Sequence, residues 1–327
     1  MISMVIPMYN AEKTILACLE PLLKQNAEII VVDDGSIDNS INIIKKFKKV
    51  KLIQQEHKGP AEARNLGVKK ARNKIVLFLD GDVILKTEDL NIILKKFREN
   101  KSLLAIQGVY TKFGYHKNLS SLYKDLYYYH FFKDISENMF PPISTHCLAV
   151  RKDSFLKLEG FDANINTASI EDAEFGLKLK NLNKKSTMLD KSLKVQHMKK
   201  YDLRSLIKTD YKMGFNKIKS LLRTGEKEKI VNIASTQKQT VLFMMSIIFS
   251  IMTALNFIFF IFTGMPFFFI ASLIIYLIIN ASLFKTFLKE AKLKSVFLLI
   301  LNFISNFFVA IAIIHGIFDM LVFRRKY

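Results

Sequence analysis

Three long apolar segments near the C-terminal end constrain the fold of this chain more than any other feature of its sequence. Thr240–Phe262, Pro266–Phe284 and Ser295–Phe318 contain 23, 19 and 24 residues without a Lys, Arg, Asp or Glu. A helix of about 20 apolar residues is long enough to cross the hydrocarbon core of a bilayer. The sequence therefore predicts an α-helical membrane region with two to three apolar helices over residues 239–327.

The connections between these segments predict how the region enters the membrane. The short turn Thr263–Met265 joins the first two segments into a hairpin, and the loop Lys285–Lys294 carries four lysines and one glutamate. An excess of basic residues marks cytoplasmic loops, so we expect the first two segments to cross the membrane and return. The third segment leaves two alternatives open. If the third segment spans the membrane, the basic residues Arg324–Lys326 would lie on the outer side, which contradicts the preference of basic residues for the cytoplasmic side. A re-entrant or interfacial helix would keep them on the cytoplasmic side.

The first 239 residues have the composition of a soluble, basic domain. They carry 42 basic and 27 acidic side chains in a chain whose formal charge is +20 and whose residues are 50% hydrophobic. That hydrophobic content excludes a disordered chain. Two cysteines, Cys18 and Cys147, are too few for a disulfide scaffold, and their lack of C-x-x-C spacing argues against a cysteine-based zinc or redox site. No basic stretch precedes a long apolar run at the start, so we expect this part to remain in the cytoplasm.

Residues 203–222 predict an amphipathic helix between the two parts. Leucines, isoleucines and Gly214 fall on one helical face, and five basic residues, among them Arg204, Lys208 and Lys212, fall on the other together with the following Arg223. Such a helix is suited to an anionic membrane surface, and the alternative is a surface helix packed on its own domain. We expect residues 201–238 to form a juxtamembrane helix and linker.

Apolar runs and helical segments alternate over the first 82 residues. The run at 2–7 is almost wholly apolar, as is typical of a strand buried on both faces, and further strands are expected at 28–32, 50–54 and 74–79. Four such strand–helix units predict an α/β fold with a doubly wound, mostly parallel sheet. The stretch 105–197 is less regular. The helices expected in the first 200 residues run from Asn10 to about Lys24, from Asp38 or Ser40 to Lys46, from Pro60 to Ala71, and from Glu171 to Leu182.

Two acidic turns follow predicted strands. Asp33 and Asp34 end the second strand before Gly35, and Asp80 and Asp82 follow the fourth. Ligands of open α/β sheets bind beyond the carboxyl ends of the strands, so these four carboxylates are expected to converge on one crevice. A carboxylate can accept a hydrogen bond from a nucleotide base, and two carboxylates can hold Mg²⁺ or Mn²⁺ with substrate phosphates completing the shell. Each turn alone is equally typical of a surface turn rich in Asp.

Taken together, the motifs of residues 2–200 resemble the family 2 glycosyltransferases, inverting enzymes with the GT-A nucleotide-sugar fold. Six strings occur in the order and spacing of that family, with Glu159-Gly160 in place of its usual Gly-Gly. The resemblance implies a GT-A-like catalytic domain over residues 1–200. The strings are Ser3-Met4-Val5-Ile6-Pro7-Met8-Tyr9-Asn10, Val31 to Asp38, Gly59 to Gly67, Asp80-Gly81-Asp82, Val150 to Asp162, and Ile170 to Phe175.

The resemblance also implies a role for individual residues. Asp172 would be the general base, Asp82 would bind the metal, and His197 would reach the metal or the pyrophosphate. Arg64 would either bind phosphate or only fix its helix. The remaining implied residues bind the nucleotide. Tyr9 and Asp34 would hold its base, Pro7 and Asp33 would shape the pocket around the base, and Asp80 would approach the ribose or the sugar.

The expected activity is transfer of a sugar from a UDP- or GDP-linked donor to a hydroxyl of a glycan or lipid-linked acceptor, with a divalent cation, Mg²⁺ or Mn²⁺, as cofactor. The expected location is the cell membrane, as a multi-pass protein with a cytoplasmic catalytic domain. One alternative is a synthase acting on a polyprenyl phosphate, which is already ionised and needs no base. Another is a non-catalytic binding protein on the same fold. Nucleic acid is not an expected partner, because no basic–aromatic stripe is present.

Overall fold

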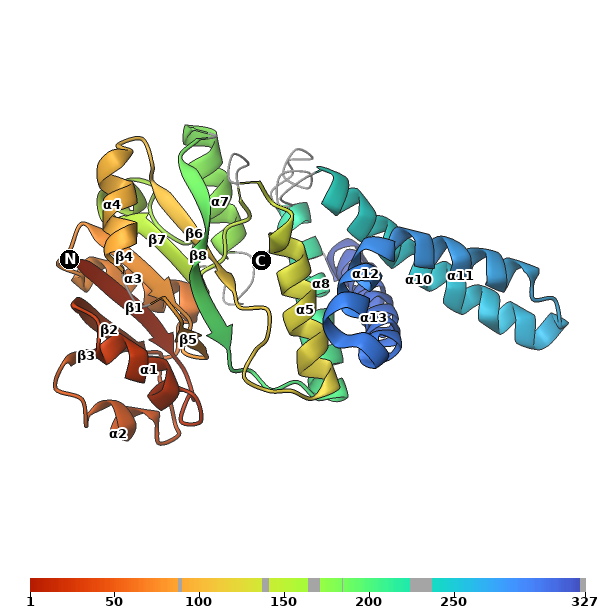
Figure 1. Cartoon of the computed structure of the whole chain (residues 1–327), viewed down its shortest axis with the longest axis horizontal. Helices are drawn as coiled ribbons and strands as arrows, with labels where there is room; N and C mark the ends of the chain where they lie inside the picture. The colour runs from red at the N-terminus through yellow and green to blue at the C-terminus, as the bar shows by residue number, and fades with distance from the viewer. Residues whose placement is uncertain (88–89, 137–140, 164–170, 184, 224–236, 324–327) are drawn as a thin grey trace. The chain divides into compact units, whose positions relative to one another are not determined.

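A computed structural model describes residues 1–87, 90–136, 141–163, 171–183, 185–223 and 237–323. The chain divides into two compact units (Figure 1). We call Met1–Tyr115 with Phe132–Lys199 the sheet unit, and His116–Phe131 with Lys200–Tyr327 the helical unit. The helical unit thus includes a segment that interrupts the sheet unit in the sequence.

The sheet unit is built on an eight-stranded sheet in the order β3-β2-β1-β4-β7-β6-β8-β5. The first four strands along the chain are parallel to one another, β7 runs antiparallel to both β4 and β6, and β6 pairs in parallel with β8. This confirms the predicted α/β fold with a mostly parallel sheet. The strands are β1 (Ile2–Met8), β2 (Ala27–Asp33), β3 (Val50–Gln54), β4 (Ile75–Leu79), β5 (Val83–Leu85), β6 (Ala105–Tyr110), β7 (Cys147–Arg151) and β8 (Thr187–His197).

Both faces of the sheet are covered by helices, because alternate residues of its central strands are apolar on both sides. Met4 and Ile6 of β1 belong to a core shared with α1, α2 and α4. Val5 belongs to a second core shared with α3, α6 and α7. The helices of the sheet unit are α1 (Ile15–Leu23), α2 (Ser40–Ile44), α3 (Pro60–Lys70), α4 (Asn91–Glu99), α6 (Lys152–Lys157) and α7 (Glu171–Leu182).

The first predicted helix begins later than the sequence pattern indicated. Asn10 does not cap it, because its backbone takes a φ of 48° and its side-chain Oδ1 accepts a hydrogen bond from the backbone N–H of Ile37. The helix starts at Ile15 instead. By contrast, α3 begins at Pro60 as predicted, since the fixed φ of proline suits the first turn of a helix.

The helical unit contains the apolar segments of the chain. Two stretches, Val241–Thr263 and Ala281–Asp319, are long and apolar enough to cross a membrane. The predicted second span is divided, because α11 ends at Ile279 and a new helix starts at Ala281. The lysine-rich loop predicted at 285–294 is mostly helical. The helices of this unit are α5 (Leu119–Lys133), α8 (Leu203–Arg223), α10 (Gln237–Thr263), α11 (Phe267–Ile279), α12 (Ala281–Ala291) and α13 (Ser295–Phe323).

The predicted amphipathic helix is α8, and it packs along α13. A Cβ on Gly214 would lie 3.1 Å from the carbonyl oxygen of Val309, so the two helices approach closely at this point. Leu206 is buried in a cluster with α12 and α13 residues. The apolar face of α8 is therefore covered by the protein around Leu206 and Gly214, whereas Leu203 is 48% exposed, and a membrane-surface role of this helix stays a prediction.

Candidate active site

The carboxyl ends of the first strands gather polar side chains at one edge of the sheet. Met8 of β1 pairs with Asp33 of β2, and β4, which ends one residue before Asp80, pairs with the other side of β1. Asp34 donates its backbone N–H to the carbonyl of Met8, which ties the two strand ends together. The two acidic turns therefore follow strands that flank β1 in the same sheet, as the sequence predicted.

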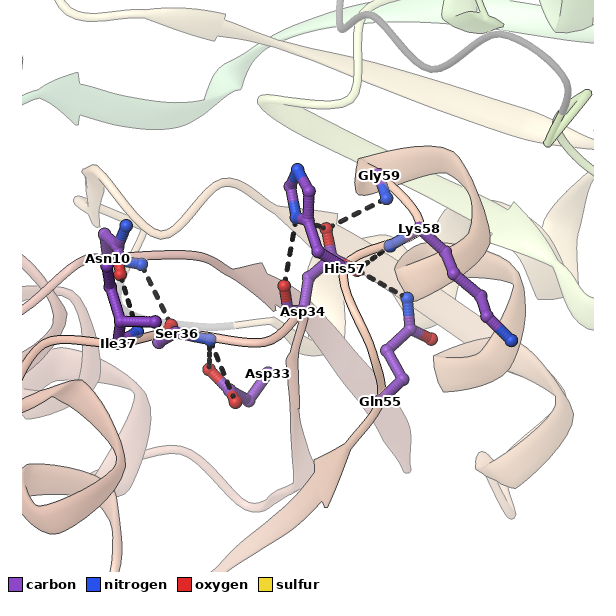
Figure 2. Close-up of polar contacts among 9 residues, drawn as sticks. All are labelled: Asn10, Asp33, Asp34, Ser36, Ile37, Gln55, His57, Lys58 and Gly59. Atoms are coloured by element: carbon purple, nitrogen blue, oxygen red, sulfur yellow. Dashed lines mark hydrogen bonds and ion pairs between the residues drawn. The ribbon is translucent and has the colours of Figure 1, made fainter.

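Asp34 lies at the centre of a dense set of hydrogen bonds (Figure 2). Its Oδ1 accepts from the Gln55 side chain at 2.7 Å and from the Lys58 backbone N–H at 2.8 Å. Its Oδ2 accepts from the Gly59 backbone N–H at 2.9 Å and lies 2.9 Å from Nδ1 of His57. With only 2% of its surface exposed, Asp34 holds the 55–59 segment in place as one wall of the site.

His57 and Gln55 were missed by the sequence reasoning. They follow β3, which is parallel to β2 and ends at the same edge of the sheet, so the topology was the available signal. His57 also stacks on Tyr9, with ring centroids 4.3 Å apart and planes 28° from parallel. Tyr9 remains 47% exposed and thus offers an open aromatic surface beside Asp34.

The turn after β2 is clamped to the turn after β1. The backbone N–H of Asn10 donates to Ser36 Oγ at 2.9 Å, and the Ile37 N–H donates to Asn10 Oδ1 at 2.9 Å (Figure 2). The carboxylate of Asp33 accepts from the Ser36 N–H at 3.3 Å. Asp33 is buried, so its contribution is to shape this turn. Pro7 lies in β1 opposite Val32 and shapes the same strand end from within the sheet.

Arg64 links three elements of the site. Its guanidinium donates to Asp80 Oδ1 at 2.8 Å and to Glu171 Oε1 at 2.9 Å, and its side chain is only 5% exposed. Burial raises the pKa of the Asp80 carboxyl, and Arg64 opposes only part of that rise. Both terminal nitrogens of Arg64 are thus engaged by carboxylates. This geometry supports the alternative in which Arg64 fixes the site, and its predicted contact with phosphate stays a prediction.

Asp172 lies in the first turn of α7, next to Glu171. Its Oδ1 accepts a hydrogen bond from the Ala173 backbone N–H at 2.7 Å. Burial and the neighbouring Glu171 carboxylate raise the pKa of Asp172 to about 7, against the lowering effect of Arg64. A carboxylate whose pKa lies near neutral pH is matched to proton transfer at that pH.

Asp82 and His197 lie close to each other. Asp82 Oδ2 lies 3.7 Å from His197 Nε2. Burial alone would raise the pKa of Asp82, but its hydrogen bond and attraction to His197 outweigh that effect and lower it. The Asp82 carboxylate is the kind of oxygen ligand that Mn²⁺ or Mg²⁺ prefers when phosphate oxygens complete the shell. Among the described residues, no three His, Cys, Asp or Glu side chains are grouped closely enough to hold a metal alone.

Tyr110 and His146 complete the surroundings of His197. Tyr110 stacks on His146 with ring centroids 4.0 Å apart, and its ring lies 5.2 Å from that of His197. Burial lowers the pKa of His146 to about 3, so its imidazole is neutral at physiological pH. Its Nδ1 lies 2.9 Å from Ser144 Oγ. Tyr110 was not identified from the sequence, because it ends a strand that the apolar pattern did not reveal.

Comparisons with known proteins indicate the family that this chain resembles. The family model described as glycosyl transferase family 2 matches residues 3–158. Glycosyltransferase GlyG of Streptococcus pneumoniae serotype 4 is 36% identical over 118 residues, which are 34% of this chain and 39% of that protein. Minor teichoic acid biosynthesis protein GgaA of Bacillus subtilis is 34% identical over 134 residues, 36% of this chain and 30% of that protein. The chain thus spans less than half the length of these two relatives.

A solved structure resembles the chain over almost its whole length. The mannosyltransferase PcManGT from Pyrobaculum calidifontis, solved in complex with GDP-Man and Mn²⁺, matches 99% of this chain and 88% of its own, with a TM-score of 0.55 and 14% identity. At that identity the likeness concerns the fold alone, which is of the GT-A type. Residues 3–158, just under half of the chain, match glycosyl transferase family 2, so this part of the chain has the character of a family 2 domain.

Proposed function

We propose that this protein is a membrane-bound, inverting glycosyltransferase that moves a sugar from a UDP- or GDP-linked donor to a hydroxyl of a cell-envelope glycan or a lipid-linked acceptor. The family 2 character of residues 3–158 supports glycosyl transfer. The observation that carries the finer proposal is the Arg64 bridge, which joins Asp80 at the end of β4 to Glu171 beside Asp172. One buried cation thereby connects the proposed donor side of the crevice to the proposed base.

The donor would lie along the edge formed by β1, β2 and β4. Tyr9 supplies an exposed aromatic face for the base, and the segment organised by Asp34 supplies backbone and side-chain groups beside it. Asp80 would lie near the ribose or sugar. A UDP- or GDP-linked donor is consistent with GDP-Man in the PcManGT structure, although that ligand belongs to PcManGT.

Asp172 would take the proton of the acceptor hydroxyl as the oxygen attacks the anomeric carbon. A hydroxyl is a poor nucleophile until its proton can leave, and a positioned base typically contributes about 10²–10⁴-fold to the rate. The new bond forms on the face opposite the departing diphosphate, so the anomeric configuration inverts. Arg64 holds Asp80 and Glu171 by hydrogen bonds, and its positive charge favours the deprotonated form of Asp172 that can accept the proton.

Asp82 and His197 would hold a divalent cation, Mn²⁺ or Mg²⁺, together with phosphate oxygens of the donor. When bound, such an ion stabilises the negative charge on the leaving diphosphate. The Asp82 carboxylate suits this role, because Mg²⁺ and Mn²⁺ prefer oxygen ligands and so few protein ligands leave the remaining positions of the shell to the substrate phosphates.

We place the sheet unit on the cytoplasmic face of the cell membrane. Two apolar helical stretches support membrane association, and the lysines after residue 284 support a cytoplasmic base. The similarity to GgaA supports an acceptor in the cell envelope. A polyprenyl phosphate acceptor is the competing case. It would leave Asp172 without a proton to accept.

The experiment that tests this function is a donor screen on the full chain in detergent micelles. Release of nucleoside diphosphate is measured for UDP- and GDP-sugars, with Mn²⁺ and with excess chelator. We expect turnover of one donor class in Mn²⁺ only. Asp34→Asn should raise the KM for that donor, because one oxygen of the carboxylate that holds the 55–59 segment is lost. No turnover of any donor with any acceptor extract would refute the proposal.

A further inference from the structure

We propose that α10 and α11 form a re-entrant hairpin, which enters the bilayer from the cytoplasmic face and turns back within it. The inference rests on the membrane association proposed above and specifies its topology. The sequence predicted that the first two apolar segments cross the membrane and return. In the proposed topology both ends of the hairpin stay on the cytoplasmic side, and only its apolar tip enters the hydrocarbon core of the bilayer.

The length of the hairpin is the first argument. Helix α11 has 13 residues, which at about 1.5 Å per residue extend about 20 Å, whereas the hydrocarbon core is about 30 Å thick. Helix α10 packs against α11 (Figure 1), and the two are joined at their base, where Ser246 Oγ donates to Asn280 Oδ1 at 3.0 Å. From Ser246 to Thr263, α10 extends about 26 Å. The returning helix is thus too short to cross the bilayer by itself.

The chemistry of the tip is the second argument. Phe262, Phe267 and Met265, which surround the turn, are 83%, 72% and 60% exposed. A hairpin that crossed the membrane would present these side chains to water or headgroups on the far side. No Lys, Arg, Asp or Glu occurs between residues 239 and 284, so nothing charged anchors the tip at a second interface. An apolar, exposed tip is instead suited to remain in hydrocarbon.

The base of the hairpin has the opposite character. A buried polar cluster ties it to α13: Asn302 Nδ2 donates to Tyr276 at 2.8 Å and to Asn280 at 3.0 Å, and Asn306 Nδ2 donates to Ser246 at 2.6 Å. Polar groups at membrane depth are costly unless they are satisfied within the protein, as these are. Directly after Asn280, α12 carries exposed lysines at positions 285 and 289. These lysines place the headgroup layer at the base of the hairpin.

The packing of α13 agrees with a one-sided anchor. Asp210 of α8 accepts a hydrogen bond from Ser305 Oγ of α13 at 2.6 Å, and Gly214, one turn later, lies against Val309. The two helices therefore run side by side in the same direction. Because α8 exposes Lys208 and Lys212 along this stretch, the α8–α13 pair would carry charges into hydrocarbon if α13 crossed the membrane.

A cysteine placed at the tip tests the topology. The only two cysteines of the chain, Cys18 and Cys147, are 1% and 0% exposed, so an added thiol becomes the accessible one. Met265→Cys is compared with Leu182→Cys, a position 52% exposed on the sheet unit. Full-length variants are treated with a membrane-impermeant maleimide in intact cells, in inverted membrane vesicles, and after solubilisation in SDS.

We expect Leu182→Cys to be labelled in inverted vesicles and not in intact cells. Met265→Cys should be labelled in neither and fully in SDS. Labelling of Met265→Cys in intact cells would mean that the hairpin crosses the membrane, which overturns the inference and leaves the membrane association intact. Labelling of Met265→Cys in inverted vesicles as readily as Leu182→Cys would mean that the hairpin is outside the bilayer, which overturns both.

A fluorescence measurement covers the case in which the cysteine variant does not accumulate. The chain contains no tryptophan, so Phe262→Trp introduces a single fluorophore at the tip. The full chain is reconstituted into vesicles whose lipids carry bromine at defined depths. We expect the strongest quenching from bromine near the acyl-chain ends, at the bilayer centre. Strongest quenching from bromine close to the headgroups would contradict a tip within the hydrocarbon.

Discussion

The pH dependence of the reaction tests the role of Asp172 in detail. The pKa of this carboxyl is raised to about 7 by burial and by Glu171. A general base acts in its deprotonated form, so a raised pKa moves the loss of activity on acidification up to near-neutral pH. An aspartate with an ordinary pKa of about 3.9 would be fully ionised throughout that range and would leave the rate constant there.

The size of the effect follows from the titration. With a pKa of about 7, the deprotonated fraction is about 0.1 at pH 6 and about 0.9 at pH 8, so kcat/KM should rise about tenfold between them. Asp172→Asn removes the accepting group while keeping the size of the side chain. We expect turnover to fall by about 10²-fold or more and the remaining activity to be independent of pH in this range.

The assay is the initial rate of nucleoside diphosphate release at low donor concentration, from pH 5.5 to 8.5, at a fixed excess of Mn²⁺. The matched control is Asp153→Asn, which changes an exposed aspartate in α6 and should keep both the rate and the pH profile. A wild-type rate that is constant between pH 6 and 8, or an Asp172→Asn variant that retains the wild-type rise, would refute the assignment of Asp172 as the base.

Three further predictions concern the supporting contacts. Arg64→Met removes the cation that lowers the pKa of Asp172, so the acid limb of the same pH profile should move to higher pH; an unchanged limb would contradict the bridging role. Lys124→Met leaves Asp210 buried without its partner and should cost about 3–5 kcal/mol in the unfolding free energy. The double variant with Asp210→Leu should recover most of that loss in a thermal melt. Gly67→Ala should lower the stability by about 1–3 kcal/mol, because the new Cβ would lie 2.3 Å from a β1 valine methyl; an unchanged Tm would contradict the close packing of α3 on the sheet.

The sequence allowed most of the parallel half of the sheet to be predicted, because β1, β2 and β4 are buried and largely apolar along their length, whereas β3 is only partly buried. The strand β8 could not be predicted from an apolar run, because Asp190 and the lysines at 191 and 194 interrupt its apolar residues. The strand β5 was missed because three residues are too few for a pattern. The break at Asn280 was also missed, since a single asparagine in an apolar run carries no signal until its hydrogen-bond partners are known.

The residues of the candidate site also fall into those that the sequence could predict and those that it could not. Asp34, Asp80 and Asp82 could be assigned to one edge of the sheet because they follow parallel strands that end there. The contact of Arg64 with Glu171 joins residues 107 positions apart, and the bond from Gln55 to Asp34 depends on how the segment after β3 folds back. Such contacts are set by tertiary packing, and neither spacing nor composition specifies them.

The most direct test of the central claim is transfer of a labelled sugar by the full chain in membranes from an expression host. The donor identified by the screen is supplied with radioactive sugar, and the label is followed into extracted glycan and lipid. We predict that label appears in an acceptor with Mn²⁺, disappears with excess chelator, returns when Mn²⁺ is restored, and is absent with Asp82→Asn. Transfer that survives both the chelator and Asp82→Asn, or no transfer from any donor, would contradict the account.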